Sequence, residues 1–164
     1  MSPVMLGAFA LRRSEICALT IDDFDFEENS VFVHRTKVIS KNGGYVIVER
    51  NKTSRSRRKV YLPEIICQKV KERGYVYDGS PNNISRFMAK VEKELGINHF
   101  SLHRLRSYYA SISDYLKAAE VSILDQGGWS SPYVMKQVYR KKIEKQNKVS
   151  AKKTVRHFEK LVAN

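Results

Sequence analysis

The chain has 164 residues, of which 42% are hydrophobic, and this size and composition exclude a disordered tail and favour one globular domain with a real core. Lys and Arg number 30 against 17 Asp and Glu, a net charge of +13, so an extended polyanion is the expected partner, nucleic acid ahead of an anionic membrane surface. Since the sequence has no run long and apolar enough to cross a membrane and no N-terminal signal pattern, we expect a cytoplasmic protein without a membrane partner.

The first part of the chain predicts one helix followed by a small sheet. An apolar helix is expected over residues 4–19, and the stretch TIDDFDFEEN after it is typical of a turn-rich acidic connector. The β-branched runs SVFVHRTKVIS and GYVIVERNKT, joined by KNGG, predict a hairpin. RRKVYLP predicts a third strand that ends at Pro63. A three-stranded antiparallel sheet is the simplest arrangement of these runs.

Helical patterns dominate the rest of the sequence, with glycines between them. They cover residues 64–73, 82–95, 101–118 and 132–145, and a last amphipathic segment covers residues 154–162. We find no internal repeat, low-complexity tract or interdomain linker. The expected fold class is therefore α+β, mainly α-helical with a small three-stranded antiparallel sheet, in one domain over residues 1–164.

The chain has two cysteines, Cys17 and Cys67, which lie far apart in the sequence. They form no CxxC pair and no His/Cys spacing of the kind that binds zinc. We therefore expect two reduced thiols that pack in the core as small hydrophobic side chains.

Basic motifs supply the candidate chemistry. If the partner is DNA, the group open to attack is a phosphodiester. Cleavage of a phosphodiester without a metal needs positive charge, a nucleophile and a proton donor for the leaving oxygen. The sequence shows no metal-binding carboxylate cluster, Walker loop or HExxH motif. It does contain LRRSE at residues 11–15, LHRLR at residues 102–106, and NKTSRSRRK between two predicted strands. His103 and Arg106 are three residues apart, which places them on one face of a helix, and an arginine fork can hold two phosphate oxygens at once.

The order of these motifs is more informative than any one of them. ALRRSEI, NKTSRSRRKVYLP, HRLRS and GGWSS follow one another, with a tyrosine ten residues after the tryptophan. This order resembles the catalytic domain of the tyrosine recombinase (phage integrase) family over nearly the whole chain. In that family two arginines, a lysine, a histidine, a His or Trp and a nucleophilic tyrosine surround one scissile phosphate. The matching positions here are Arg12, Lys52, His103, Arg106, Trp129 and Tyr139, and Glu15 matches the acid that supports the site.

The resemblance implies DNA strand cleavage and rejoining through a 3′-phosphotyrosyl intermediate, with no metal and no other cofactor. Tyr139 would attack the phosphorus and release a 5′-hydroxyl. Because a free phenol has a pKa near ~10, it needs a proton acceptor, for which His103 is the candidate. Arg12 and Arg106 would stabilise the added negative charge, and Lys52 would protonate the departing oxygen.

Trp129 has two compatible interpretations. Its indole N–H can donate to a phosphate oxygen while its ring fills the core beneath the site. The family usually has glycine at the position of Ala10, aspartate at the position of Arg104, and often histidine at the position of Trp129. None of these departures removes a catalytic group.

The remaining charged residues are divided between DNA contacts and packing. Five cations are expected to contact the DNA backbone: Arg55, Arg57, Arg104, Lys136 and Arg140. Arg13 and the histidines His34, His99 and His157 are expected to be structural. The expected partner is double-stranded DNA carrying an attachment or recombination site, bound by a homotetramer with accessory DNA-bending factors. In that assembly the segment at residues 154–162 would dock on a neighbouring protomer.

Two alternatives stay open from the sequence. A type IB topoisomerase uses similar chemistry but relaxes supercoils, and a basic DNA-binding module would bind phosphates without catalysis. The family also has an N-terminal domain that closes around DNA opposite the catalytic one. The sequence contains no match to it, so we expect an N-terminally truncated catalytic domain from a phage or another mobile element.

Overall fold

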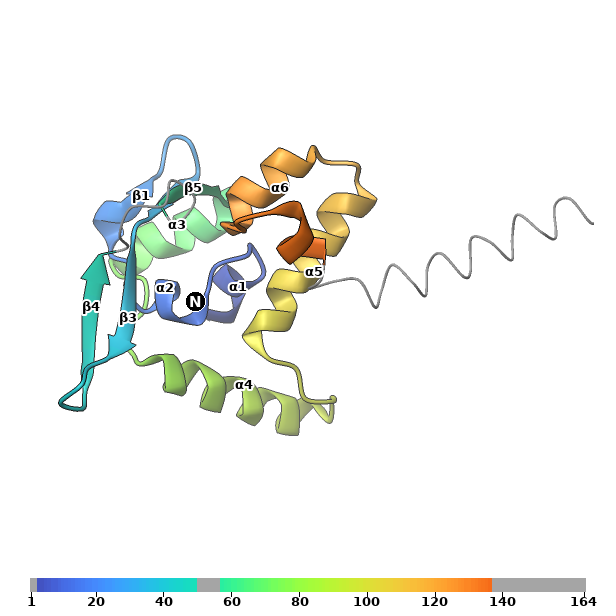
Figure 1. Cartoon of the computed structure of the whole chain (residues 1–164). Coiled ribbons are helices and arrows are strands. Elements are labelled where there is room, and N and C mark those ends of the chain that lie inside the picture. The colour runs from blue at the N-terminus through green and yellow to red at the C-terminus, as the bar shows by residue number, and fades with distance from the viewer. Residues whose placement is uncertain (1–2, 50–56, 137–164) are drawn as a thin grey trace, which may run out of the picture.

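The computed structural model describes residues 3–49 and 57–136. Within them the chain is mainly helical with small antiparallel sheets, which confirms the expected fold class (Figure 1). Two short helices lie in the middle of the molecule and contact the longer helices α4 (Pro81–Leu95) and α5 (Leu102–Tyr115). The predicted segment at residues 154–162, and residues 137–145 of the predicted helix before it, lie outside the described residues.

The apolar N-terminal segment forms two helices, so the prediction of one helix over residues 4–19 was wrong. α1 spans Pro3–Gly7 and α2 spans Arg13–Ile16. Between them Ala10 has a φ of 65°, a left-handed conformation that turns the chain at a cost of about 1–3 kcal/mol for a non-glycine residue. Arg12 is extended and forms the N-cap of α2. Arg12 therefore lies at the start of a helix and not near the end of one.

The strands form two sheets instead of the single three-stranded sheet that was predicted. One sheet has the order β1-β2-β5 and the other is the β3–β4 hairpin, all pairs being antiparallel. A 3-10 turn at Ile21–Asp23 comes first, and the strands are β1 Phe24–Asp25, β2 Ser30–Val33, β3 Arg35–Ile39, β4 Tyr45–Glu49 and β5 Arg58–Tyr61. The run SVFVHRTKVIS is interrupted at His34. At this break Asp23 accepts a hydrogen bond from Arg35 (2.7 Å) and pairs with His34 (2.9 Å). The hairpin and the strand before Pro63 were predicted correctly, but β5 pairs with β2.

Four longer helices follow: α3 Glu64–Arg73, α4 Pro81–Leu95, α5 Leu102–Tyr115 and α6 Glu120–Gly127. The first three agree with the sequence patterns, although α5 ends three residues earlier than predicted. The sequence did not predict α6, whose C-cap residue Gly128 has the left-handed conformation. Residues 132–136, the start of the helix predicted over residues 132–145, are also helical. None of the helices in the described part of the chain is both long and apolar enough for a membrane span.

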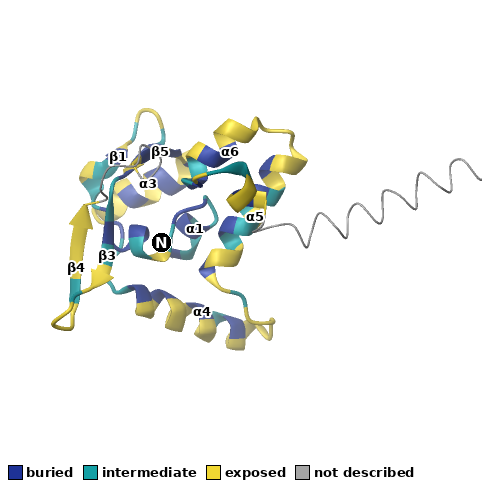
Figure 2. Cartoon of the chain, in the orientation of Figure 1, coloured by how far each residue is buried: buried dark blue, intermediate teal, exposed yellow. Residues whose placement is uncertain are grey.

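The hydrophobic core has two parts, and the second surrounds the candidate site. The larger cluster joins α1, α2, the three-stranded sheet, α3, α4 and the start of α5. The smaller one contains Ala10, Ala110, Ile123, Leu124, Trp129 and Met135. Figure 2 shows the central helices buried, while β4 and the outer faces of α4 and α5 are exposed.

Both cysteines are buried free thiols, as the sequence predicted. Burial raises the pKa of the Cys17 thiol to about 11, although Lys37 and Arg13 act in the opposite direction. Burial also raises the pKa of Cys67. Because the thiolate is the reactive form, both cysteines are chemically inert packing residues.

Candidate active site

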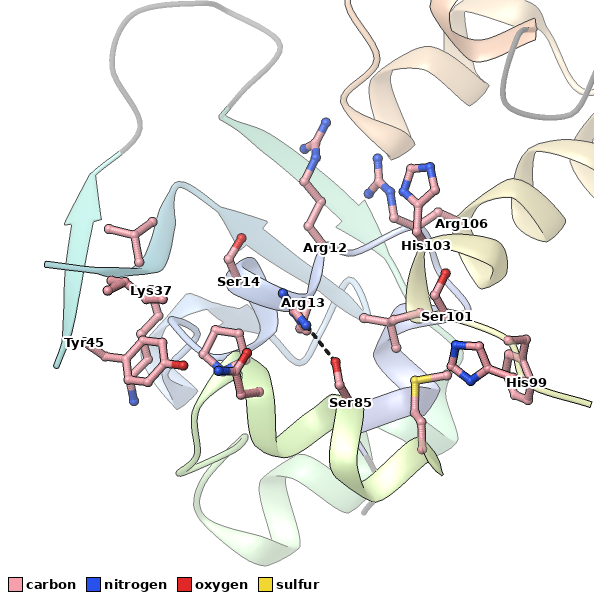
Figure 3. Close-up of a pocket in the computed structure, with 17 residues that line it drawn as sticks. Arg12, Arg13, Ser14, Lys37, Tyr45, Ser85, His99, Ser101, His103 and Arg106 are labelled. Atoms are coloured by element: carbon pink, nitrogen blue, oxygen red, sulfur yellow. Dashed lines mark hydrogen bonds between the residues drawn. The ribbon is translucent and has the colours of Figure 1, made fainter. Parts of the chain in front are cut away.

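A cationic pocket of about 750 Å³ opens between the start of α2, the β3–β4 hairpin, α4 and the start of α5. Arg12, His103 and Arg106 lie together at one end of it, with the Arg106 guanidinium beside the imidazole (Figure 3). Arg13 and Lys37 add two further cations along its length. The structure therefore brings together three of the residues that the sequence singled out, from segments more than 90 residues apart.

Arg12 is held by a carboxylate and by a carbonyl. Its Nη1 donates to Glu15 Oε1 (2.7 Å), its backbone N–H donates to Glu15 Oε2 (2.6 Å), and its Nη2 donates to the Gly128 carbonyl (2.9 Å). Glu15 is fully buried, whereas the Arg12 side chain is 33% exposed. Arg12 is therefore fixed in direction but still accessible to a ligand in the pocket.

Arg106 lies deeper than Arg12, with 2% of its surface exposed. It donates to the carbonyls of Ala10 and Gly127, the latter at 2.9 Å, and its guanidinium lies 5.0 Å from the centre of the Trp129 ring. The left-handed turn at Ala10 directs that carbonyl toward the guanidinium. Glycine at this position would adopt the turn without strain.

His103 is one helical turn from Arg106 and lines the same pocket. Partial burial lowers the pKa of its imidazole below the ordinary value of 6.5, and the charges of Arg106 and Arg12 lower it further. A lowered pKa keeps the imidazole neutral at pH 7. The side chain is therefore in the state that can accept a proton.

Arg58 on β5 is a residue of this site that sequence reasoning did not select. It is buried and makes a two-pronged ion pair with Glu15, with Nη1–Oε1 at 3.0 Å and Nη2–Oε2 at 2.9 Å. Its Nε donates to the Gln126 carbonyl at 3.0 Å. The burial pattern of β5 alternates, so Arg58 faces inward together with Val60. This alternation, with an arginine at an inward position, is the signal by which the sequence could have identified it.

Three consecutive carbonyls at the end of α6 accept hydrogen bonds from three arginines. Gln126 accepts from Arg58, Gly127 from Arg106, and Gly128 from Arg12. The last carbonyls of a helix have no partner within the helix, and this end of the helix dipole is negative. The end of α6 therefore stabilises a cluster of like charges that would otherwise repel one another.

Trp129 directly follows this turn and is 4% exposed. Its ring packs in the second core cluster and against Arg106, so the core-filling interpretation of Trp129 is confirmed. Its role as a phosphate donor stays a prediction.

The other predicted residues are less informative. Arg57 and Arg104 are exposed, with Arg57 lying 5.8 Å from the Phe32 ring, and Lys136 pairs with Glu120 at 2.6 Å. Arg13 donates to Ser85 at 2.7 Å, which agrees with a structural role (Figure 3). Lys52, Arg55, Tyr139 and Arg140 lie outside the described residues.

Gly127→Ala is expected to disturb this site directly, because an added Cβ would overlap the Trp129 ring. We expect a loss of about 1–3 kcal/mol in the free energy of unfolding and a shift in tryptophan emission, since the ring must move. Urea unfolding followed by fluorescence measures both quantities. Gly96→Ala is the matched control, because its Cβ meets no atom within 4 Å and only its φ of 62° is unfavourable. Equal effects of the two changes would contradict the packing argument.

The sequence model of the Phage integrase family matches residues 4–146, and the chain therefore belongs to that family, the tyrosine-type site-specific recombinases. A search of curated proteins by sequence found no match.

Several solved structures share the fold of this chain. The Tn1549 transposon integrase in complex with circular intermediate DNA has a TM-score of 0.70 and 20% identity, over 88% of this chain and 58% of that one. The same integrase with transposon right end DNA gives 0.67 and 22%, over 84% and 52%. XerA recombinase gives 0.61 and 16%, over 88% and 61%. The chain thus spans between about half and three fifths of the length of these proteins.

Proposed function

We propose that this chain is the catalytic domain of a site-specific DNA recombinase that cleaves and rejoins strands through a 3′-phosphotyrosyl intermediate. The observation that supports this most strongly is the meeting of Arg12, His103 and Arg106 in one pocket. Cations on two sides of a phosphate can stabilise the charge that develops on its oxygens during attack. The proposal does not require a metal ion or any other cofactor.

Each group has a distinct task in the proposed reaction. Arg106, which is held by two carbonyls, and the more exposed Arg12 would bind the nonbridging oxygens of the scissile phosphate. The neutral imidazole of His103 would accept the proton of the Tyr139 phenol as its oxygen bonds to phosphorus. The bond from phosphorus to the 5′-oxygen breaks, and Lys52 would supply the proton to that oxygen. Attack by a 5′-hydroxyl on the phosphotyrosyl bond reverses these steps and rejoins the strand.

Double-stranded DNA is the proposed substrate, and a homotetramer on DNA, with accessory DNA-bending factors, is the proposed assembly. The net charge of +13 supports a polyanionic partner, and the related Tn1549 integrase structures are complexes with DNA. The reaction would take place on DNA in the cytoplasm.

The proposal is tested with a duplex that has a nick beside the cleavage position. The short 5′-hydroxyl strand then diffuses away and traps the covalent intermediate. Wild type should give a protein-linked DNA band on a denaturing gel in the presence of EDTA, and the matched control Tyr139→Phe should give none while retaining DNA affinity. The natural protein and the attachment site of its own genetic element are used for this test. Failure of this protein to give the band, or a band that persists without Tyr139, would reject the mechanism.

The acid limb of the pH–rate profile should reflect His103. Burial and the two arginines lower the pKa of His103. The rate of covalent-complex formation, measured at subsaturating DNA, should therefore not change as the pH falls from 7 to 6.5. Below pH 6.5 the rate should decrease, because the imidazole gains a proton and can no longer accept one from the phenol. His103→Gln should remove this limb together with most of the activity. His99→Gln should retain it, because His99 pairs with Glu92 at the far side of the pocket. A midpoint above pH 6.5 would contradict the assignment.

A further inference from the structure

We infer that Arg58 is a positioning residue of the proposed reaction, which sets the direction of Arg12 and the place of the turn before Trp129. This inference rests on the proposed function for the reaction that it affects. Arg58 itself is buried and does not line the pocket, so it acts through the groups that it contacts.

The first contact is with the carboxylate that holds Arg12. Glu15 Oε1 accepts from Nη1 of both arginines, and Oε2 accepts from Arg58 Nη2 and from the backbone N–H of Arg12. Glu15 cannot rotate without breaking its ion pair with Arg58. Arg58 on β5 therefore sets the direction of the Arg12 guanidinium through Glu15.

The second set of contacts is with the backbone around the site. Arg58 Nε donates to the Gln126 carbonyl at 3.0 Å, and Nη2 lies 3.5 Å from the Ala10 carbonyl, which also accepts from Arg106. Gln126 adds a second link between the same elements, since its side-chain amide pairs with both backbone groups of Tyr61 on β5. The Arg58 side chain thus contacts the start of α2, the Ala10 turn and the end of α6.

The chemistry of this position requires a guanidinium. A planar fork donates to both oxygens of a carboxylate and still has Nε available for a carbonyl, whereas an ammonium group has a single centre. Arg58→Lys should therefore resemble Arg58→Met more than wild type. Lys59→Met is the matched control, because Lys59 neighbours Arg58 on β5, has the same charge, and pairs with Glu28 outside the site.

The experiment measures three quantities for each variant: DNA affinity, the single-turnover rate of covalent-complex formation at saturating DNA, and the emission of Trp129, which is the sole tryptophan of the chain. Arg58→Met should lower the rate by about 100-fold, because a small misplacement of Arg12 is enough for that loss. DNA affinity should stay close to that of wild type, since Arg58 is not exposed to the ligand. Emission should shift even without DNA, because the turn before Trp129 loses a contact. Added guanidinium ion should restore part of the rate in Arg58→Ala.

Arg58→Met leaves Glu15 as a buried charge and can fail to fold, so the double variant Glu15→Gln/Arg58→Met decides that case. It removes both buried charges and should fold, yet cleave about 100-fold more slowly than wild type because Arg12 has lost the carboxylate that fixes its direction. A double variant with the wild-type rate, or an Arg58→Met variant that matches Lys59→Met in rate and emission, would overturn the inference. If wild type itself forms no covalent complex, the proposed function fails. The comparison of Trp129 emission between Arg58→Met and Lys59→Met still decides whether Arg58 positions the turn before Trp129.

Discussion

Replacement of Arg106 with lysine should lower the rate of DNA strand cleavage by about 100- to 1000-fold, comparable to the loss of one preorganised donor to a developing oxyanion. The variant keeps the positive charge, so the fall in the cleavage rate would measure how much the planar, two-pronged shape of the guanidinium contributes to catalysis. Arg106 contacts the carbonyls of Ala10 and Gly127 and lies over the Trp129 ring. A lysine cannot satisfy these partners and also present a pair of donors to a phosphate.

Single-turnover formation of the covalent complex on the nicked duplex measures this effect. DNA affinity should fall much less than the rate, because the many phosphates outside the site dominate binding. Arg73→Lys serves as the control, since Arg73 is exposed and stacks on Tyr75 at 4.0 Å, outside the pocket. If Arg106→Lys cleaved DNA within a few-fold of wild type, Arg106 would be a structural residue and the proposed mechanism would lack its main source of charge stabilisation.

The members of the cluster of Arg12, His103 and Arg106 could be predicted on two different grounds. His103 and Arg106 are three residues apart in a helical pattern, so elementary helix geometry places them on one face. The approach of Arg12 to this pair is a long-range contact, and only the order of motifs typical of the family predicted it. The structure confirms that these residues meet, while their catalytic roles stay predictions.

The parts of the site that could not be predicted depend on long-range contacts. Residues 4–19 have the composition of a continuous apolar helix, yet the chain turns at Ala10, where the carbonyl accepts from Arg106 and approaches Arg58. No local pattern encodes a turn that distant arginines stabilise. The helix α6 has only eight residues, too few for a clear period, and its importance comes from the three carbonyls at its end.

The sheet shows the same limit on a smaller scale. The runs of β-branched residues identified where strands form, but not which strands pair. The break between β2 and the separate hairpin falls at His34, where Asp23 contacts both His34 and Arg35. That hairpin lines one side of the pocket with Lys37 and Tyr45, so the break in the strand also shapes the site (Figure 3).

The buried carboxylate of Glu15 connects stability and function, and its removal should have the largest effect on stability. Glu15→Ala would leave Arg58 as a buried cation without the carboxylate that it contacts, a change that costs about 3–5 kcal/mol. For a domain of this size that corresponds to a fall of about 6–20 °C in Tm. Thermal and urea unfolding, followed by circular dichroism, measure both quantities.

The control is Glu28→Ala, which breaks the exposed pair with Lys59 and should change the free energy of unfolding very little. Glu15→Gln should fall between the two, because the amide can still accept hydrogen bonds through one oxygen but no longer balances the guanidinium charges. Similar unfolding free energies for Glu15→Ala and Glu28→Ala would mean that Arg58 finds water or another partner when Glu15 is lost. Arg12 could then not depend on a rigid Glu15–Arg58 pair for its direction, so this measurement tests the physical basis of the site independently of any DNA substrate.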